Sequence, residues 1–476
     1  MCFITMTKVK TYCVDAGIVP TKLLWRAKRP ILDKKTYSIL TFGCQMNKLD
    51  SEVAAGHLQA AGFTPAQTLE SADLLLVNSC SVRAKAQDRA TTTLRSFPRA
   101  KNATNSTRLV GIMGCVAQQM KGKLLDAPFK ADFVIGARAL PRLGEVIDRL
   151  LAGERGIVAL DSERPDCDYD PSIIHRTGKR SAYVAVSRGC SNRCTYCIVP
   201  YVRGPIWHRN PENIINEATQ LAQSGYLDIC LLGQNVNNYS HGRWNFTKLL
   251  ERLAQTDGLK RLRFITTHPK DLSIETVKLM AHPPLVPYIS LPLQSGSDRI
   301  LRLMNRGYTR TEYLEKVSWL REHIDCSFIS TDIMVGFPGE SEADFEDTLE
   351  VVRLAKFDNI YSFIYSPRPF TKAAALKNEV PRDVVKQRFK RLLALERQNN
   401  IDSLRRLVGR TLEVLVDGAS RKDRAVACGR CPQNVVVNLP HDSCAVGELV
   451  LAKITTAGIH SLVGKLTRRL MPAPKS

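Results

Sequence analysis

The stretch "RGCSNRCTYCIVPYVRG", residues 188–204, places three cysteines at positions 190, 194 and 197, with the spacing C-x3-C-x2-C. A structural zinc site takes four ligands, usually as two close pairs. His208 and Cys230 are conceivable fourth ligands here, but both are badly spaced for that role. A [4Fe–4S] cube held by three thiolates instead leaves its fourth iron open. Cys190, Cys194 and Cys197 therefore predict a cluster with an open coordination position, where chemistry takes place.

The same stretch lies at the start of a regular alternation of strands and helices. "YVAVSRGC" at 183–190 predicts a strand, and "PENIINEATQLAQSG" at 211–225 predicts a helix. Further strands are predicted at 226–235, 262–269, 286–297 and 327–341, each followed by a helical pattern. About six such units in some 200 residues indicate a partial or complete (β/α) barrel, whose chemistry lies at the carboxyl ends of its strands.

A second alternation precedes this one and predicts a parallel α/β domain. Apolar strands are expected at 37–44, 72–80 and 108–115, with a helix at 51–63. Continuous apolar strands separated by helices are typical of a parallel sheet covered on both faces. Each of these strands ends in a cysteine: Cys44, Cys80 and Cys115.

Those three strand ends predict a second metal site. Parallel strands all finish at one edge of their sheet, which is where open sheets bind ligands. Cysteine is often buried as a small apolar residue, so one such placement means little. Three cysteines at the ends of three consecutive strands favour a metal cluster on Cys44, Cys80 and Cys115 over three unrelated core thiols.

The rest of the chain divides into an extension, a linker and a small barrel. Residues 1–35 are a basic extension, read either as a transit peptide or as the product of a wrongly chosen start codon, and 36–151 form the first α/β domain. Residues 152–181 read as a linker, in which Cys167 has no role, and 182–407 form the central barrel. β segments at 411–418, 434–439, 447–458 and 461–466 predict a small antiparallel barrel over 408–471.

The charge balance predicts a polyanionic partner. Lys and Arg outnumber Asp and Glu 68 to 46, giving a net charge of +22. Nucleic acid is the first candidate and an acidic membrane surface the second, and no apolar run is long enough to span a bilayer. The helical stretch 381–410 contributes nine Lys or Arg against three Asp or Glu. Fourteen cysteines without a secretory signal favour a reducing, cytoplasmic location.

The cysteine motif, with Tyr196 before its last cysteine, resembles the signature of radical S-adenosylmethionine (SAM) enzymes. "TFGCQMNKLDSE" (41–52), "VNSCSVRAKAQDRA" (77–90) and "GCVAQQ" (114–119), in that order, are similar to the methylthiotransferase family. The resemblance covers roughly 36–470 and includes a segment similar to the TRAM RNA-binding domain. Within the family, "LLGQNVNNY" (231–239), "HPKDL" (268–272) and "YSFIYSPRPFTKAA" (361–374) most resemble the tRNA branch.

This resemblance implies a radical SAM reaction with two [4Fe–4S] clusters and SAM as cofactors. SAM binds the open iron of the cluster on Cys190, Cys194 and Cys197, and its cleavage activates carbon 2 of an isopentenylated adenosine next to the tRNA anticodon. The cluster on the first three thiols supplies or holds the inserted sulfur, which a second SAM methylates. The implied partners are the anticodon loop of tRNA, an electron donor such as flavodoxin or ferredoxin, and a sulfur or cluster supply system, with no membrane.

Residues near the expected strand ends are candidates for SAM contact in the same resemblance. They are Gly233, Gln234, Asn235, Gln294, Ser295, Asp332 and Gly336, together with Glu340. Each of them taken singly is nearly as well explained as a turn residue that follows a strand. Arg203 and Arg209 are expected either to contact phosphate or the SAM carboxylate, or to be solvated.

Two departures from the family pattern and one further cysteine group remain. Ile206, Trp207 and His208 replace the usual "E-x-S", and Phe370 and Lys372 stand where Gly and Pro are usual, so substrate fit is expected to differ. Cys428, Cys431 and Cys444 are possible zinc ligands for which His441 is the only fourth candidate. The alternative functions are methylthiolation of a ribosomal protein or of threonylcarbamoyl-adenosine, and a non-enzymatic iron–sulfur RNA-binding module.

Overall fold

The computed structural model describes residues 35–101, 104–161, 170–420, 423, 425–440 and 444–474. Apart from Lys35, the predicted basic extension lies outside these residues. Cys167 in the predicted linker and His441 also lie outside them.

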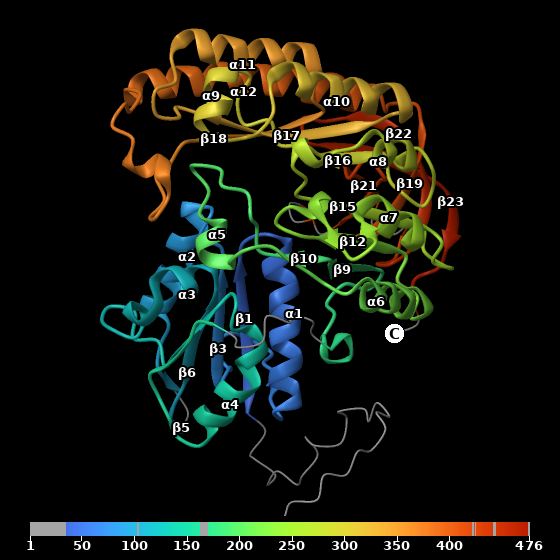
Figure 1. The fold of residues 1–476 in the computed structure, drawn as a ribbon. Helices are drawn as coiled ribbons and strands as arrows, with labels where there is room; N and C mark the ends of the chain where they lie inside the picture. The colour runs from blue at the N-terminus through green and yellow to red at the C-terminus, as the bar shows by residue number, and fades with distance from the viewer. Residues whose placement is uncertain are drawn as a thin grey trace, which may run out of the picture.

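The N-terminal part is a six-stranded parallel sheet in the order β2-β1-β3-β6-β7-β8 (Figure 1). Helices α1 and α4 cover one face of it, and α2 and α3 cover the other. The predicted parallel sheet with two covered faces is therefore confirmed. The elements are β1 Thr36–Phe42, α1 Gln45–Ala60, β2 Thr64–Pro65, β3 Leu74–Ser79, α2 Ala84–Ser96, β4 Ala100–Lys101, β5 Thr104–Thr107, β6 Leu109–Gly114, α3 Cys115–Met120, β7 Phe133–Gly136, α4 Leu143–Leu151 and β8 Ile157–Ala159.

Two boundaries of this part differ from the sequence prediction. Helix α1 begins six residues earlier than expected, because the polar residues Asn47 and Asp50 are buried in its first turns instead of lying in a loop. The sheet also extends beyond residue 151, since β8 pairs with β7 inside the stretch predicted as a linker. Ile157 and Ala159 of β8 are buried against the sheet core.

The central part consists of two three-stranded parallel sheets, β9-β12-β15 and β16-β17-β18. A parallel bridge between Leu262 and Leu285 connects them, and β9 and β18 do not pair within the described residues, so the predicted barrel is partial. The predicted strand at 286–297 is reduced to three residues, β16. The elements are β9 Ser181–Ala185, β10 Ser187–Arg188, α5 Val199–Arg203, β11 Trp207–His208, α6 Pro211–Gln223, β12 Asp228–Leu232, β13 Ser240–His241, β14 Trp244–Asn245, α7 Phe246–Ala254, β15 Arg261–Phe264, α8 Ile274–Met280, β16 Tyr288–Ser290, α9 Asp298–Leu303, α10 Arg310–His323, β17 Phe328–Val335, α11 Glu342–Ala355, β18 Asn359–Ile364 and α12 Arg382–Arg405.

The C-terminal part is a closed five-stranded barrel in the order β19-β20-β21-β23-β22. Its strands are β19 Thr411–Ala419, β20 Val426–Arg430, β21 Val436–Pro440, β22 Leu449–Ala457 and β23 Ser461–Met471. Four were predicted, but β20 was not, because its inward residues Ala427 and Gly429 are small and give no apolar alternation. The pair β21–β23 is parallel, whereas all the other pairs are antiparallel, as predicted.

Two arginines of α12 form ion pairs with glutamates in the segment 340–346. Arg388 is buried and forms ion pairs with Glu340 and Glu342, and Arg391 pairs with Glu342 and Glu346. These ion pairs fasten α12 to α11. Arg391 itself and the cations Lys386 and Lys390 are exposed on the surface. Among the residues that the structure describes, none of the helices has the length and apolar character needed to cross a membrane.

Candidate functional site

Cys44, Cys80 and Cys115 lie at one edge of the N-terminal sheet. The register pairs Phe42 with Ser79 and Ser79 with Gly114, and each cysteine follows its strand within two residues. The side chains of Cys44 and Cys80 share a hydrogen bond, which lowers the pKa of the Cys44 thiol and raises that of Cys80. Burial raises the pKa of the Cys115 thiol.

A buried charge network surrounds this thiol set. The Arg203 Nε donates a hydrogen bond to the Cys115 Sγ over 3.2 Å, and its guanidinium pairs with Asp50 at 2.8 Å. Arg188 pairs with the same carboxylate at 2.7 Å. Burial acts to raise the pKa of the Asp50 carboxyl, but Arg203 and Arg188 together outweigh it and hold that pKa below its usual value. Asp50 therefore stays ionised between two arginines.

Arg203 and Arg209 are both buried, so the expectation that they are solvated is wrong. Arg203 contacts a thiol and a carboxylate of the protein. Arg209 is fully buried, pairs with Glu217 at 2.7 Å and donates to the Ala185 carbonyl. Its partners are internal, which makes Arg209 a structural residue of the central part.

The second thiol set occupies the loop between β10 and α5. The Cys190 N–H donates to the Gly204 carbonyl, and the Cys197 N–H donates to the Cys194 carbonyl, each over 3.1 Å. Burial raises the pKa of the Cys197 thiol to about 12, and neighbouring Cys194 adds to the shift. The loop is therefore folded back, and its thiols lie close enough to raise one another's pKa.

Arg306 contacts this set and was missed by the sequence analysis. It is 5% exposed, and its Nη1 lies 3.4 Å from the Cys194 Sγ, to which it donates. Its other nitrogens donate to the Pro292 carbonyl and the Tyr308 hydroxyl, each over 3.0 Å. A single arginine in a loop more than 100 residues away carries no sequence signal for such a contact.

The two thiol sets meet through α5, which begins two residues after Cys197. Ile198 and Val202 pack against Cys115 and Ala137 in one small apolar cluster. Arg203, the last residue of α5, reaches the Cys115 sulfur. Figure 1 shows α5 beside α2 and α3, at the end of the N-terminal sheet that faces the central part. The structure therefore brings both sets to one junction.

Three of the candidate SAM-contact residues lie beside the second thiol set. The Gln234 Oε1 accepts a hydrogen bond of 2.5 Å from the Gly189 N–H, next to Cys190. A Cβ on Gly233 would lie 2.5 Å from the Ser187 hydroxyl and 3.1 Å from the Val236 Cα, so a larger residue there would have to displace its neighbours. The Asn235 amide donates to Asp271, while its buried Oδ1 has no partner within the described structure.

The four other candidates divide into two pairs. Gln294 has a φ of +74°, and its N–H donates to the Asp332 carbonyl over 2.8 Å. Burial raises the pKa of the Asp332 carboxyl to about 6, against the opposing effect of Arg83 and Arg306. Ser295 and Gly336 instead contact helices: the Ser295 hydroxyl lies 3.3 Å from the Thr348 hydroxyl, and a Cβ on Gly336 would lie 2.6 Å from a methyl group of Val385.

The structure places two residues of the first departure from the family pattern, Trp207 and His208, and two of the C-terminal cysteines, Cys431 and Cys444. Trp207 and His208 form β11, which pairs with the two residues of β10 just before Cys190. Cys431 is buried in the core of the C-terminal barrel, and Cys444 packs against it. No three His, Cys, Asp or Glu side chains in the described part of the chain are arranged to hold a single metal ion, and this applies to all three cysteine groups.

The chemistry of the junction fits an anionic iron–sulfur cluster at each thiol set. Each set offers three thiols and one buried arginine within hydrogen-bond distance of a sulfur. The Arg203 Nη1 is buried and has no hydrogen-bond partner among the described residues. A buried donor of this kind is costly unless an acceptor satisfies it. The sulfur atoms of an iron–sulfur cluster accept hydrogen bonds, so the residues at the junction fit such a cluster.

Solved structures share the fold at low sequence identity. A radical SAM methyltransferase, TsrM from Kitasatospora setae, with cobalamin and a [4Fe–4S] cluster bound, has a TM-score of 0.53 and 15% identity. The alignment covers 72% of this chain and 74% of that one. The same protein with tryptophan and a SAM analogue bound gives a TM-score of 0.53 at 16% identity, over 72% and 75% of the two chains. The central fold is therefore that of radical SAM proteins.

Family models and curated relatives agree along the length of the chain. Residues 184–352 match the radical SAM superfamily, 36–136 match the uncharacterized protein family UPF0004, and 405–467 match the TRAM domain. The tRNA-2-methylthio-N(6)-dimethylallyladenosine synthase of Moorella thermoacetica is 40% identical over 91% of this chain and 98% of its own length. That of Caldicellulosiruptor saccharolyticus is 42% identical over 91% and 92%. The chain belongs to the family of these tRNA-2-methylthio-N(6)-dimethylallyladenosine synthases.

Proposed function

We propose that the protein is a tRNA-2-methylthio-N(6)-dimethylallyladenosine synthase, which adds a methylthio group at carbon 2 of an isopentenylated adenosine next to the tRNA anticodon. The observation that carries this proposal is the junction of two three-thiol sets, each contacted by a buried arginine. A reaction that needs both a radical source and a sulfur donor uses two such sites. If the protein held a single structural cluster, one of the two three-thiol sets would have no role.

The ligand assignment follows from the two sets. Cys190, Cys194 and Cys197 would hold one [4Fe–4S] cluster with SAM at its open iron, and Cys44, Cys80 and Cys115 would hold the other. When bound, these groups supply one-electron cleavage of SAM and the sulfur that is inserted, which are steps that side chains alone do not perform. Gly233, Gln234, Asn235, Gln294 and Asp332 are the proposed SAM contacts, supported by their links to the Cys190 loop and to Arg306. Ser295 and Gly336 support the same site through α11 and α12.

The chain's own residues fix the position of the loop that carries Cys190, Cys194 and Cys197. The Thr195 N–H donates to the Met304 carbonyl, and the Thr195 carbonyl accepts from Ala373. Tyr196 packs into an apolar cluster that includes Met304 and Phe337. The loop is thus anchored on two sides and backed by apolar groups on one face, so that it would hold the cluster and SAM in a fixed position.

The tRNA would be recognised partly outside the reaction site. The net charge of +22 provides sequence-independent attraction for phosphates, and the C-terminal barrel matches the TRAM domain. A base must be unstacked before its ring carbon can react, which is easier in an anticodon loop than in a duplex. An electron donor such as flavodoxin or ferredoxin and a sulfur or cluster supply system complete the proposal, in the cytoplasm where tRNA is modified.

Anaerobic reconstitution with nucleoside analysis tests this function. The wild-type chain should bind about eight iron atoms, as two cubes require, and should form 5′-deoxyadenosine under reduction. tRNA from a deletion strain should regain the methylthio-nucleoside with the wild-type gene but not with Cys190→Ala or Cys80→Ala. Restoration by Cys190→Ala would refute the catalytic assignment. Methylthiolation of a ribosomal protein or of threonylcarbamoyl-adenosine instead would redirect the substrate.

A further inference from the structure

Two exposed aromatic side chains lie beside the thiol junction without being part of it. Phe370 is 63% exposed and Tyr201 is 49% exposed. Their ring centroids are 6.0 Å apart, with an angle of 36° between the rings. Exposed apolar side chains that gather on a surface mark sites of interaction when they form a patch, and these two rings are in contact with each other.

The backbone at Phe370 supports a functional reading. Its φ is +71°, in the left-handed region where glycine is favoured and a bulky side chain is an outlier. Strained residues of this kind persist where the surrounding structure holds them, and they cluster at ligand sites. Because Phe370 is 63% exposed, burial in a core does not explain the presence of a ring at this position.

Both aromatic residues are tied to the thiol loops. Tyr201 lies on α5, four residues after Cys197. The segment that carries Phe370 is held by two hydrogen bonds: Ala373 donates to the Thr195 carbonyl over 2.8 Å, and Arg368 donates to the Val82 carbonyl over 2.9 Å. In Figure 1 this segment, between β18 and α12, descends from the central part toward α2 and α5.

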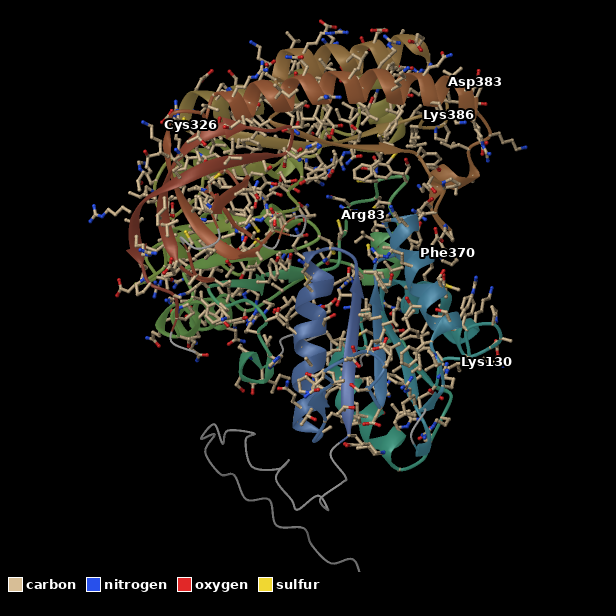
Figure 2. All side chains as sticks on the ribbon, turned by 180° about the vertical axis from the view of Figure 1, so that it is seen from behind. Arg83, Lys130, Cys326, Phe370, Asp383 and Lys386 are labelled. Atoms are coloured by element: carbon tan, nitrogen blue, oxygen red, sulfur yellow. The ribbon has the colours of Figure 1, made fainter. Side chains whose placement is uncertain are left out.

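The surroundings of the pair suit a nucleotide. Val82 is 48% exposed and its N–H donates to the Cys80 Sγ, so it forms part of the same rim. Arg83 follows it and is also exposed. Figure 2 shows Arg83 and Phe370 where the N-terminal sheet meets the central part. In single-stranded RNA, flat aromatic rings bind bases by stacking, and exposed guanidinium groups bind phosphates.

We propose that Tyr201 and Phe370 form a stacking platform for an unpaired nucleobase of the tRNA that neighbours the reacting adenosine, with the exposed Arg83 adding positive charge for the phosphates of the loop. This inference rests on the proposed function. It identifies an unpaired base of the tRNA as the part of the substrate that binds beside the thiol junction. The platform binds one base face without reading its hydrogen-bonding edges, so it favours an open loop over a helix.

Substitution of Phe370 separates stacking from folding. Phe370→Gly removes the ring and relieves the backbone, so the melting temperature should be unchanged or higher. The Kd for unmodified tRNA carrying the isopentenyl group should rise about 5- to 150-fold, as expected for the loss of one stacked base. Phe370→Tyr should bind like the wild type. Leu354→Ala, at a residue 57% exposed on α11, is the matched control and should change nothing.

Each outcome bears on one proposal. Equal Kd values for wild type and Phe370→Gly, or failure of Phe370→Tyr to retain binding, would overturn the platform. Formation of 5′-deoxyadenosine without tRNA should be the same in all four proteins, and its loss in Phe370→Gly would likewise refute a role confined to RNA. A wild-type chain that binds the tRNA but yields no methylthio-nucleoside would instead overturn the proposed function.

Discussion

Arg203 is the residue on which the electrostatics of the thiol junction depend. Its side chain is 4% exposed, and it shares Asp50 with Arg188 while donating to the Cys115 sulfur. Removing one partner of a buried ion pair leaves an uncompensated charge and typically costs about 3–5 kcal/mol. The remaining Arg188 should reduce that cost here.

Arg203→Gln should therefore destabilise the protein by about 2–3 kcal/mol and weaken the N-terminal cluster. Urea unfolding measures the first effect. Iron content after anaerobic reconstitution, falling from about eight toward about four atoms per chain, measures the second. The exposed Arg243→Gln serves as control. Full iron content in Arg203→Gln would show that the guanidinium does not support the cluster.

His268 makes the stability of the central part depend on pH. It is 6% exposed, its Nδ1 accepts the Lys270 N–H, and its ring contacts Tyr308 edge-on. Burial, with Arg306 and Lys270 nearby, lowers the pKa of its imidazole to about 2. A depressed folded-state pKa gives stability that is present above the unfolded value near 6.5 and is lost as the pH falls below it.

We expect the wild type to lose about 1.4 kcal/mol from this group between pH 7.5 and 5.5. His268→Asn should be less stable at pH 7.5 but should lack that part of the pH dependence, as should be seen in urea midpoints at the two pH values. The exposed His282→Asn should keep the wild-type slope. Identical slopes for His268→Asn and wild type would show that His268 titrates normally.

The cysteines were predictable as residues, and their charged neighbours were not. Cys44, Cys80 and Cys115 stand at strand ends that apolar runs reveal directly. Asn47, Asp50, Arg203 and Arg306 are polar, and pattern reasoning places polar residues in loops or solvent. They are buried because each finds a partner far away in the chain, such as Asp50 with Arg188, 138 residues apart.

At the scale of elements, Gly336 decides how closely α12 packs on the central strands. Its φ is +78°, and a Cβ there would lie 2.6 Å from a methyl group of Val385. Gly339 has a φ of +84° but would meet no atom within 4 Å. Both glycines therefore adopt a positive φ, but only at Gly336 would an added Cβ meet a neighbouring atom.

Gly336→Ala should therefore lower the free energy of unfolding by about 1–3 kcal/mol more than Gly339→Ala does, since overpacking adds to the backbone strain. Thermal or urea unfolding of the two variants measures the difference. Equal losses would mean that Val385 moves aside without cost. The comparison also shows whether Gly336 serves the packing of α12 apart from any SAM contact.

The elements that sequence reasoning missed lack the pattern of large apolar residues by which strands and helices are recognised. Strand β20 packs Ala427 and Gly429 inward, and a Cβ on Gly429 would lie 2.2 Å from the Leu415 carbonyl oxygen. Small residues are required there by the close approach of β19, so the apolar alternation that identifies a strand is absent. The first turns of α1 were missed for the complementary reason, because their buried positions hold polar side chains.

At the scale of the whole molecule, the C-terminal barrel is fastened to the central part by a mixed interface. Tyr288 and Phe328, at the starts of β16 and β17, lie in the same apolar cluster as Val414 and Val437 of the barrel. Arg261 is 4% exposed and donates to the Glu413 side chain over 2.8 Å, and also to the Arg430 carbonyl over 2.7 Å. The net charge indicated an RNA partner, but no sequence pattern indicated this contact, because its two sides are 152 residues apart.

Arg261→Ala should therefore loosen the barrel while leaving the thiol junction intact. It removes a buried cation and leaves Glu413 and the Arg430 carbonyl without their donor, for an expected loss of about 2–4 kcal/mol. Limited proteolysis should cut more rapidly near 405–411, and KM for tRNA should rise, whereas iron content and SAM cleavage without tRNA should match the exposed control Arg252→Ala. A loss of SAM cleavage would mean that the barrel also shapes the radical site. An unchanged KM would mean that the barrel's position, as distinct from its presence, does not matter for tRNA binding.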